Sequence, residues 1–252
     1  MSAQKKPLIL LLAGLASLAA GAAAGDGFTR QFPILSCDFK STGGNAFLKL
    51  KVGRQLYLNN QRCVDDGDCD ELVELWITML PDTKVVNFEY GGRPLAVRTR
   101  VMEEFEMVDG ELDEVSRNYV ADCNPMHDVY YFGEDVEDGD GNPLPDAWLA
   151  GVDGARPGIL MPDRAFLLGS RYYQELAPNA QDRAEHTSMS NEVEVPAGTF
   201  ARCVEITETS PLEPGSESVK DFCPNVGFVR EGDEGLELIS IAEDATSPSA
   251  KK

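Results

Sequence analysis

The chain has few histidines and lacks the short motifs of the common hydrolases. Only two histidines, His127 and His186, occur in its 252 residues. The sequence contains no G-x-S-x-G elbow, no phosphate-binding glycine loop and no H-E-x-x-H zinc motif. His127 lies beside an expected turn and His186 within an ordinary strand pattern, so both are interpreted as surface residues and not as partners of a nucleophile. The sequence therefore predicts no catalytic residue and favours a non-enzymatic protein. A hydrolase of unrecognised type is the third functional hypothesis.

Basic residues are also scarce. The chain has 22 Lys and Arg against 43 Asp and Glu, a formal net charge of −21. Nucleic acids and anionic membrane surfaces are bound mainly through Lys and Arg, so no nucleic-acid partner is expected. The plain interpretation is a charged surface that keeps the protein in solution, and the alternatives are a bound cation or a basic partner.

Long hydrophobic runs are absent after the first 24 residues. Lys5 and Lys6 precede an apolar run at residues 7–20, and Ala22 to Ala24 form an A-x-A cleavage site. This order is typical of a cleaved secretory signal peptide, predicted for residues 1–24. A membrane anchor is the alternative, but the run is shorter than the roughly 20 residues that a spanning helix needs. We expect no membrane span and a soluble exported product, either periplasmic or secreted.

Six cysteines in an exported chain predict three disulfides, although fifteen pairings are formally open. Cys63 and Cys69 enclose a short, turn-prone loop. Cys203 and Cys223 lie symmetrically about the turn at 210–215, so they face each other if the flanking strands form a hairpin. Cys37 and Cys123 then pair by elimination. Zinc is the alternative, but no pair has C-x-x-C spacing.

Short alternating runs dominate the rest of the sequence and predict an all-β domain over residues 25–242. The expected strands are 85–90, 95–107, 115–120, 129–132, 171–175, 184–195, 200–209, 217–222, 228–231 and 236–241. Residues 71–80 fit either a helix or a strand; a strand is preferred, with a hairpin partner beginning directly after Pro81 and Asp82. The predicted fold class is a mainly antiparallel, strongly curved sheet, sandwich or open barrel with little helix.

Two segments depart from this pattern. Residues 147–162 combine three glycines and two prolines with several large apolar residues, and are expected to form an ordered crossover loop on the sheet. Residues 243–252 have mostly small or polar side chains and are expected to be a flexible tail.

Several longer segments carry a family resemblance. They are DTKVV at 82–86, VDGELDEVSRNYVA at 108–121, VYYFGEDV at 129–136, AWLAGVDGARPGILMP at 147–162, YYQELAPNAQDRAE at 172–185, VPAGTFARCVEITETSPLEPG at 195–215 and PNVGFVRE at 224–231. In this order they resemble a family of bacterial secreted or envelope β-rich proteins without a settled activity. The resemblance implies an extracytoplasmic antiparallel β fold and no particular reaction. The chain departs from the family pattern at residues 123–128 and in its cysteine-containing N-terminal third, which we interpret as added crosslinking.

Calcium is the only cofactor that the residue pattern suggests. Asp138, Asp140 and Asn142 follow D-x-D-x-N spacing, with Asp146 further on. However, Pro143 follows where a calcium loop favours Gly, and a solvated hairpin turn explains the same residues. A calcium-stabilised structural module is therefore the second functional hypothesis, and otherwise no cofactor is expected.

The first hypothesis is a non-enzymatic binding or interaction protein of the cell envelope. A strongly curved antiparallel sheet can hold an apolar ligand in its concavity, and the alternative partner is another envelope protein. The candidate ligand-binding residues are Phe132, Glu134, Trp148, Asp153, Leu160, Tyr172 and Glu175. The competing interpretation places the aromatic members of this set in the core.

Overall fold

The computed structural model describes residues 26–163, 167–232 and 234–251, and the predicted signal peptide lies outside them. Alternating side chains give this part of the chain fifteen strands and three short helical turns. They are η1 (Ile34–Ser36), β1 (Asp38–Lys40), β2 (Gln55–Asn59), α1 (Gln61–Asp66), β3 (Val73–Tyr90), β4 (Arg93–Val108), β5 (Glu111–Asn124), β6 (Asp128–Asp138), β7 (Trp148–Leu149), β8 (Arg156–Met161), β9 (Arg171–Tyr173), β10 (Glu175–Leu176), β11 (Arg183–Val195), β12 (Gly198–Thr209), β13 (Glu217–Cys223), β14 (Gly227–Glu231), β15 (Leu236–Ala242) and η2 (Pro248–Lys251).

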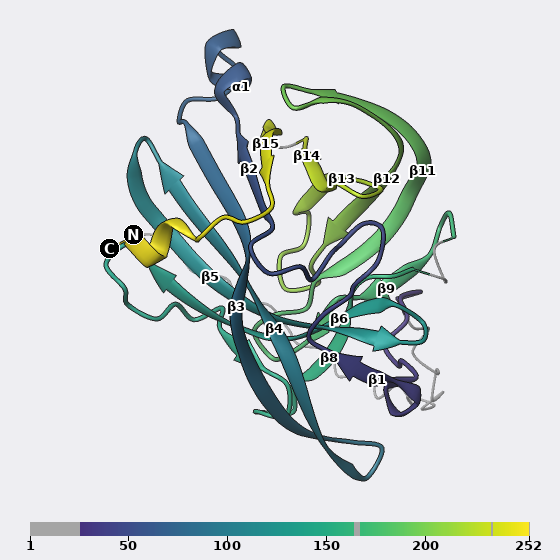
Figure 1. Cartoon of the computed structure of the whole chain (residues 1–252). Helices are drawn as coiled ribbons and strands as arrows, with labels where there is room; N and C mark the ends of the chain where they lie inside the picture. Colours follow the sequence, from purple (N-terminus) through teal and green to yellow (C-terminus); the bar gives the residue numbers. More distant parts are fainter. Residues whose placement is uncertain (1–25, 164–166, 233, 252) are drawn as a thin grey trace, which may run out of the picture.

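The strands form one antiparallel sheet that curves until it nearly closes into a barrel (Figure 1). Its order is β10-β8-β6-β5-β4-β3-β2-β15-β14-β13-β12-β11-β9, with β1 beside β5 and β7 beside β6. The two ends of this order are β9 and β10, which are separated in the sequence by Gln174 alone. The segment 171–176 therefore pairs with β11 through β9 and with β8 through β10, and so links both edges of the sheet. The predicted all-β fold class is confirmed.

The expected hairpin turn at Pro81 and Asp82 is wrong. Residues 71–80 do form a strand, but β3 continues through these two residues with only a register shift between Met79 and Thr83. Arg100 on the neighbouring strand explains the continuity, because its Nη1 donates hydrogen bonds to the carbonyl oxygens of Leu80, Pro81 and Asp82. The irregular stretch is thus satisfied by a side chain, and the strand bends instead of reversing.

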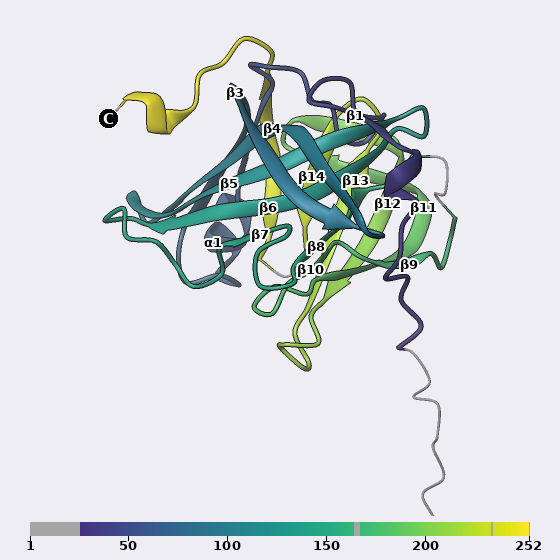
Figure 2. The same ribbon diagram turned by 90° about the horizontal axis from the view of Figure 1, so that it is seen from below.

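Beyond this bend, the outer half of the β3–β4 hairpin folds over the outer face of β5 and β6 (Figure 2). The ring centroids of Phe88 on β3 and Phe132 on β6 lie 5.7 Å apart. Phe39 of β1 adds an edge contact to Phe132 at 5.1 Å. Part of the larger hydrophobic core therefore lies outside the barrel wall, between β5–β6 and the segments that cover them, and is called the outer core below.

Residues 147–162 are not an irregular loop as expected, because they contain β7 and β8. Trp148 and Leu149 pair with Glu134 and Gly133 of β6, and residues 156–161 form the next strand of the sheet. The glycine-rich turn is confined to 150–155, where Gly151 approaches Phe88 so closely that a Cβ atom would lie 2.8 Å from the Phe88 side chain. The apolar residues flank that turn and supply two strands.

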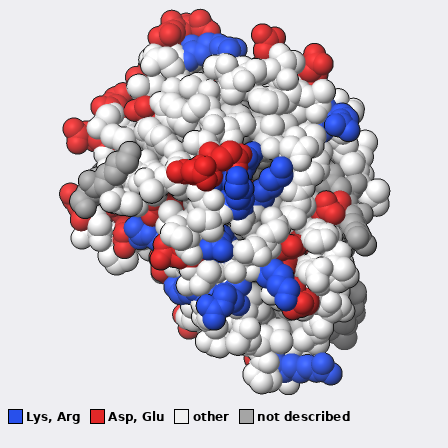
Figure 3. Space-filling model, in the orientation of Figure 1, with Lys and Arg blue, Asp and Glu red and all other residues white. Residues whose placement is uncertain are grey.

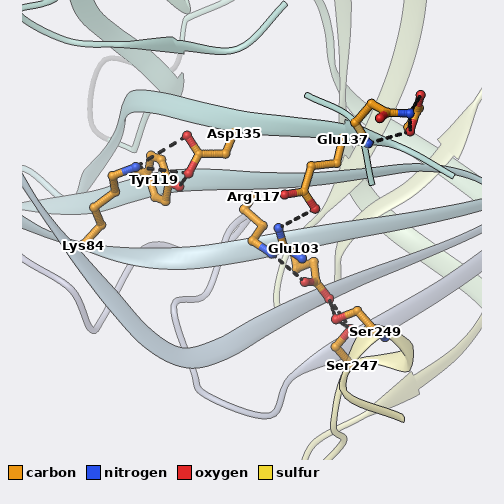
Figure 4. A network of polar contacts seen from close by, with 10 residues as sticks. Lys84, Glu103, Arg117, Tyr119, Asp135, Glu137, Ser247 and Ser249 are labelled. Carbon is orange, nitrogen blue, oxygen red and sulfur yellow. Dashed lines mark hydrogen bonds and ion pairs between the residues drawn. The ribbon is translucent and has the colours of Figure 1, made fainter. Parts of the chain in front are cut away.

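The C-terminal segment also differs from the expected flexible tail. Glu243 forms ion pairs with Lys51, at 2.8 Å, and with Arg54. Ser247 is buried and donates a hydrogen bond to Glu103, which also accepts one from Ser249 at 2.7 Å (Figure 4). Small polar side chains dock here because β4 presents a buried carboxylate for them to bind.

The three disulfides join the cysteines in the pairs that spacing and elimination favoured. They are Cys37–Cys123, Cys63–Cys69 and Cys203–Cys223. Glu205 and Asp221 face each other in the same hairpin, as its expected register requires. Arg230 offsets their repulsion through an ion pair of 2.6 Å to Asp221.

His186 is fully buried, so its interpretation as a surface residue is wrong. Its Nε2 lies 3.0 Å from the hydroxyl of Tyr172, and burial lowers its pKa from 6.5 to about 4. A histidine that stays neutral in the folded state and protonates at higher pH when unfolded stabilises the fold above pH 6.5. That contribution is lost as the pH falls toward 4.

We expect His186→Gln to weaken this acid sensitivity, because the amide can accept from Tyr172 but does not titrate. The measurement is the urea unfolding free energy at pH 7 and pH 4.5, with His127→Gln as the control. His127 is partly exposed. If the unfolding free energy of both variants changes with pH as it does in the original protein, burial of His186 is not the cause of the acid sensitivity.

Candidate ligand-binding cavity

A cavity of about 410 Å³ lies inside the curved sheet and is called the interior cavity below. Its wall includes residues of β2, β3, β4 and β5 and, facing them, residues of β12, β13 and β14. Strands β4 and β13 are not neighbours in the sheet, so side chains from them meet across the barrel. The volume falls within the range of about 300–1,000 Å³ typical of small-molecule sites.

Strand alternation puts a set of carboxylates into this cavity. On β4, Glu104 and Glu106 point inward while Glu103 points outward to Arg117. Glu114 on β5 and Glu134 on β6 extend the set along the same side. The acidic residues that line the cavity are Glu104, Glu106, Glu114, Glu134, Glu175, Asp182, Glu208, Glu231 and Glu234.

Lys220 of β13 neutralises part of this charge. Its Nζ lies 2.8 Å from Glu208 and 3.6 Å from Glu231. Burial disfavours its charged form, but attraction to these carboxylates is stronger and raises the Lys220 pKa well above its usual range. Lys220 therefore stays positively charged and forms ion pairs with both Glu208 and Glu231.

Three of the other carboxyl groups have strongly raised pKa values. Burial is the main cause and raises the pKa of Glu104, Glu106 and Glu134 to about 7. Neighbouring carboxylates add repulsion in each case, while Lys220 favours the charged form of Glu104 and a 2.8 Å hydrogen bond from Tyr131 favours that of Glu134. Near neutral pH these groups therefore exchange protons with small changes in their surroundings.

Glu175 forms the wall of the cavity beside the segment that links the two sheet edges. It is buried and accepts a hydrogen bond from the backbone N–H of Asp182. Burial and repulsion from Asp182 raise the Glu175 pKa well above its usual range. Glu175 thus holds the 177–182 loop against β10 as well as facing the cavity.

The remainder of the lining is largely apolar. Its large apolar members are Leu48, Leu56, Leu75, Ile77, Met79, Met102, Leu160, Met161, Phe222, Phe228 and Leu236. Leu75, Ile77 and Met79 alternate along β3, directly beside Glu104 and Glu106 on β4. The interior cavity therefore combines an apolar wall with a carboxylate wall, an arrangement suited to a molecule with both kinds of surface.

The predicted ligand-binding residues divide into two groups. Glu134, Leu160 and Glu175 line the interior cavity. Phe132, Trp148 and Tyr172 are buried outside its lining, and Asp153 lies in the exposed turn between β7 and β8. Phe132 belongs to the outer core because it alternates with Tyr131, whose hydroxyl faces inward to Glu134.

Sequence reasoning missed Glu104, Glu106, Glu114 and Lys220. For Glu104 and Glu106 the sequence does contain a signal. In residues 101–106 the odd and the even positions point to opposite faces of the strand, and both sets contain apolar residues. Such a strand has two covered faces and no purely solvent-facing one. An acidic residue on it is therefore a candidate for an interior site.

The residues considered for calcium occupy the β6 hairpin end and the loop that follows. The Asp138 carboxylate accepts hydrogen bonds from the backbone N–H groups of Asp140 and Asn142 and from the Asn142 side chain. These bonds lower the Asp138 pKa. Asp146 lies on the loop before β7. Within the described residues, no group of three or more His, Cys, Asp or Glu is arranged to hold a metal ion.

Charged groups on the outside follow a different pattern. Figure 3 shows acidic and basic side chains interspersed over one face, with wide uncharged areas between them and no continuous acidic field. Outer carboxylates such as Asp135 and Glu137 are paired, with Lys84 and Arg117 respectively (Figure 4). Glu104, Glu106 and Glu114 of the interior cavity differ from these outer carboxylates, because they form no ion pair within the described residues.

No protein-family model and no curated protein matches the chain. Among solved structures it is similar to a crystal structure of a Bacteroides fragilis protein with a YmcC-like fold, at 16% identity. The match covers 78% of this chain and 99% of that chain with a TM-score of 0.37. A similarity at this level carries no functional argument, and the family resemblance seen in the sequence stays a prediction. No helix in the described ranges has the length and apolar composition needed to cross a membrane.

Proposed function

We propose that the protein is an exported, non-enzymatic binding protein that holds a small ligand with an apolar body in the interior cavity. The observation that carries the proposal is the cavity itself, enclosed by the curved sheet and lined on one side by Leu75, Ile77 and Met79. Three disulfides support export, because such bonds persist in oxidising compartments. The cell envelope or the extracellular space is the expected location.

The calcium-stabilised module has less support. The Asp138 carboxylate is engaged by its own loop, and this hydrogen bonding fits a hairpin turn without a bound ion. The interior cavity, in contrast, offers space that no side chain of the described part fills. Ligand binding therefore explains why the fold has an interior cavity, and the hypothesis of a calcium-stabilised module does not.

The test is isothermal titration of the mature, disulfide-bonded protein with 1-octanol. Each buried CH₂ contributes about 0.8 kcal/mol, so we expect a dissociation constant below about 1 mM. Ala180→Trp places an indole in the cavity wall from a loop, and we expect it to weaken binding at least about tenfold. Ala96→Trp adds the same side chain at an exposed position of the β3–β4 hairpin and is the matched control.

Binding that is lost in Ala180→Trp and kept in Ala96→Trp supports the proposal, provided that both variants keep the circular dichroism spectrum of the original protein. Absence of 1-octanol binding, or equal binding by all three proteins, contradicts it. If Ala180→Trp fails to fold, Leu160→Trp on β8 provides a second obstruction of the same cavity.

A further inference from the structure

The geometry points to a cationic amphiphile as the ligand class: we infer that the interior cavity binds a molecule with a positively charged amine head and an apolar tail. This inference rests on the proposed binding function and names its ligand chemistry. Its basis is a set of three cavity carboxylates, Glu104, Glu106 and Glu114, that form no ion pair within the described residues, together with the apolar wall beside them.

The first step is the pairing of charges. Three basic residues line the interior cavity, Lys49, Arg54 and Lys220. Lys220 is held by Glu208 and Glu231, and Arg54 is held by Glu243 and by the carbonyl oxygens of Asn225 and Val226. Neither forms an ion pair with the carboxylates of β4 and β5. Lys49 interacts electrostatically with Glu243, and within the described residues it forms no ion pair with those carboxylates either.

The second step concerns those carboxylates. Glu104, Glu106 and Glu114 have no hydrogen bond or ion pair within the part of the chain that the structure describes. All three line the cavity and retain partial exposure toward it. Buried carboxylates without a partner are costly, since a charged group in a protein interior is normally paired or hydrogen-bonded. A bound cation would supply the missing partner.

The third step is the shape of the lining. Glu104 and Glu106 on β4 are opposite Ile77 and Leu75 on β3, so acidic and apolar side chains are adjacent on neighbouring strands. Phe222 and Phe228 face them from β13 and β14. A small hydrated metal ion would leave this apolar surface uncovered, and a neutral apolar molecule would leave the carboxylates unpaired. A molecule with a charged head and an apolar tail satisfies both.

The binding should depend on pH. Glu104 is faced by Lys220, Glu231, Glu114 and Glu208, and Glu106 by Glu234, Glu114, Asp113 and Glu104. The groups facing Glu134 are Tyr131, Glu104, Asp182 and Glu114. Since the pKa of each of these three carboxyl groups is about 7 in the empty protein, they are neutral at pH 5 and charged at pH 8. A permanent cation therefore binds more tightly at the higher pH and releases protons from the site.

The test compares three ligands with the same chain: octyltrimethylammonium, 1-octanol and octanoate. At pH 8 we expect octyltrimethylammonium to bind at least about tenfold more tightly than 1-octanol, and octanoate to bind more weakly than either. At pH 5 the preference for the cation should fall below about threefold, while 1-octanol binding changes little. Titration in two buffers of different ionisation enthalpy measures the proton release directly.

The decisive variant is Glu104→Gln/Glu106→Gln/Glu134→Gln, which should lose the preference for octyltrimethylammonium over 1-octanol at pH 8. Its matched control is Glu89→Gln/Glu192→Gln/Glu194→Gln, which removes the same formal charge from exposed positions. The single variant Glu104→Gln serves if the triple variant does not fold. Loss of the preference in the interior variant alone supports the inference.

Two results would overturn it in distinguishable ways. If octyltrimethylammonium and 1-octanol bind equally at pH 8, or if the exposed variant loses the preference as much as the interior one, the cationic ligand is wrong and the binding function stands. If none of the three ligands binds, the binding function itself is wrong, and the inference fails with it.

Discussion

Removing the Cys37–Cys123 disulfide is expected to destabilise the protein more than removing either of the other two. This bridge closes a segment of 86 residues, against 20 for Cys203–Cys223 and 6 for Cys63–Cys69. The restriction of the unfolded chain increases with the length of the closed loop, and it corresponds to roughly 4 kcal/mol for the longest loop and about 2 kcal/mol for the shortest. The order of the three losses is therefore set by sequence separation.

The measurement is urea unfolding of Cys37→Ala/Cys123→Ala and of Cys63→Ala/Cys69→Ala as the matched control. Alanine avoids burying an unsatisfied hydroxyl at Cys123, which is fully buried. We expect melting temperatures lower by roughly 8–16 °C for the first variant and about half as much for the second. Equal losses would mean that local packing, and not the constraint on the unfolded chain, determines what each bridge contributes.

The elements with clear period-two alternation were predictable from the sequence. Residues 184–195 and 200–209 were expected as strands with turn residues between them, and they form β11 and β12, which pair with each other. The Cys203–Cys223 pair followed for the same reason, because the register of a hairpin fixes which residues face each other. Local pattern was sufficient wherever the partner of a strand was its neighbour in the sequence.

The errors arose where a distant residue decided the local structure. Pro81 and Asp82 resemble a turn, but Arg100 satisfies the carbonyl groups there and the strand continues. Ser247 lies in a segment of small polar residues that resembles a loose tail, but buried Glu103 accepts its hydrogen bond. No window of local sequence contains such partners, so neither outcome was accessible from alternation alone.

The candidate site was predictable only in outline. A ligand in the concavity of a curved sheet was expected, and Glu134, Leu160 and Glu175 do line the interior cavity. The direction in which Phe132 points depends on an irregularity in the pairing of β5 with β6, where the register shifts between Asn118 and Val120. A shift of one residue exchanges the two faces of a strand, so aromatic residues expected inside are found in the outer core.

The second large effect concerns the stability of the empty protein as the pH rises. The pKa of Glu104 is about 7 in the folded state and near 4.5 when the chain is unfolded and the carboxyl group is hydrated. An acid whose pKa is raised by folding stabilises the folded state below the lower value, and this stabilisation is lost as the pH rises through the higher one. Between pH 5 and pH 8 the loss for one such group is up to about 3 kcal/mol.

Glu104→Gln should remove this loss, because the amide has a similar shape and no charge. We expect the difference in unfolding free energy between Glu104→Gln and the original protein to grow in favour of the variant from pH 5 to pH 8. Glu89→Gln, at an exposed position, should show a constant difference near zero. Titrating groups that do not interact with Glu104, such as His186, are common to all three proteins and cancel in the comparison. A difference for Glu104→Gln that stays constant across this range would mean that the carboxyl group of Glu104 is not held in its neutral form by the interior cavity.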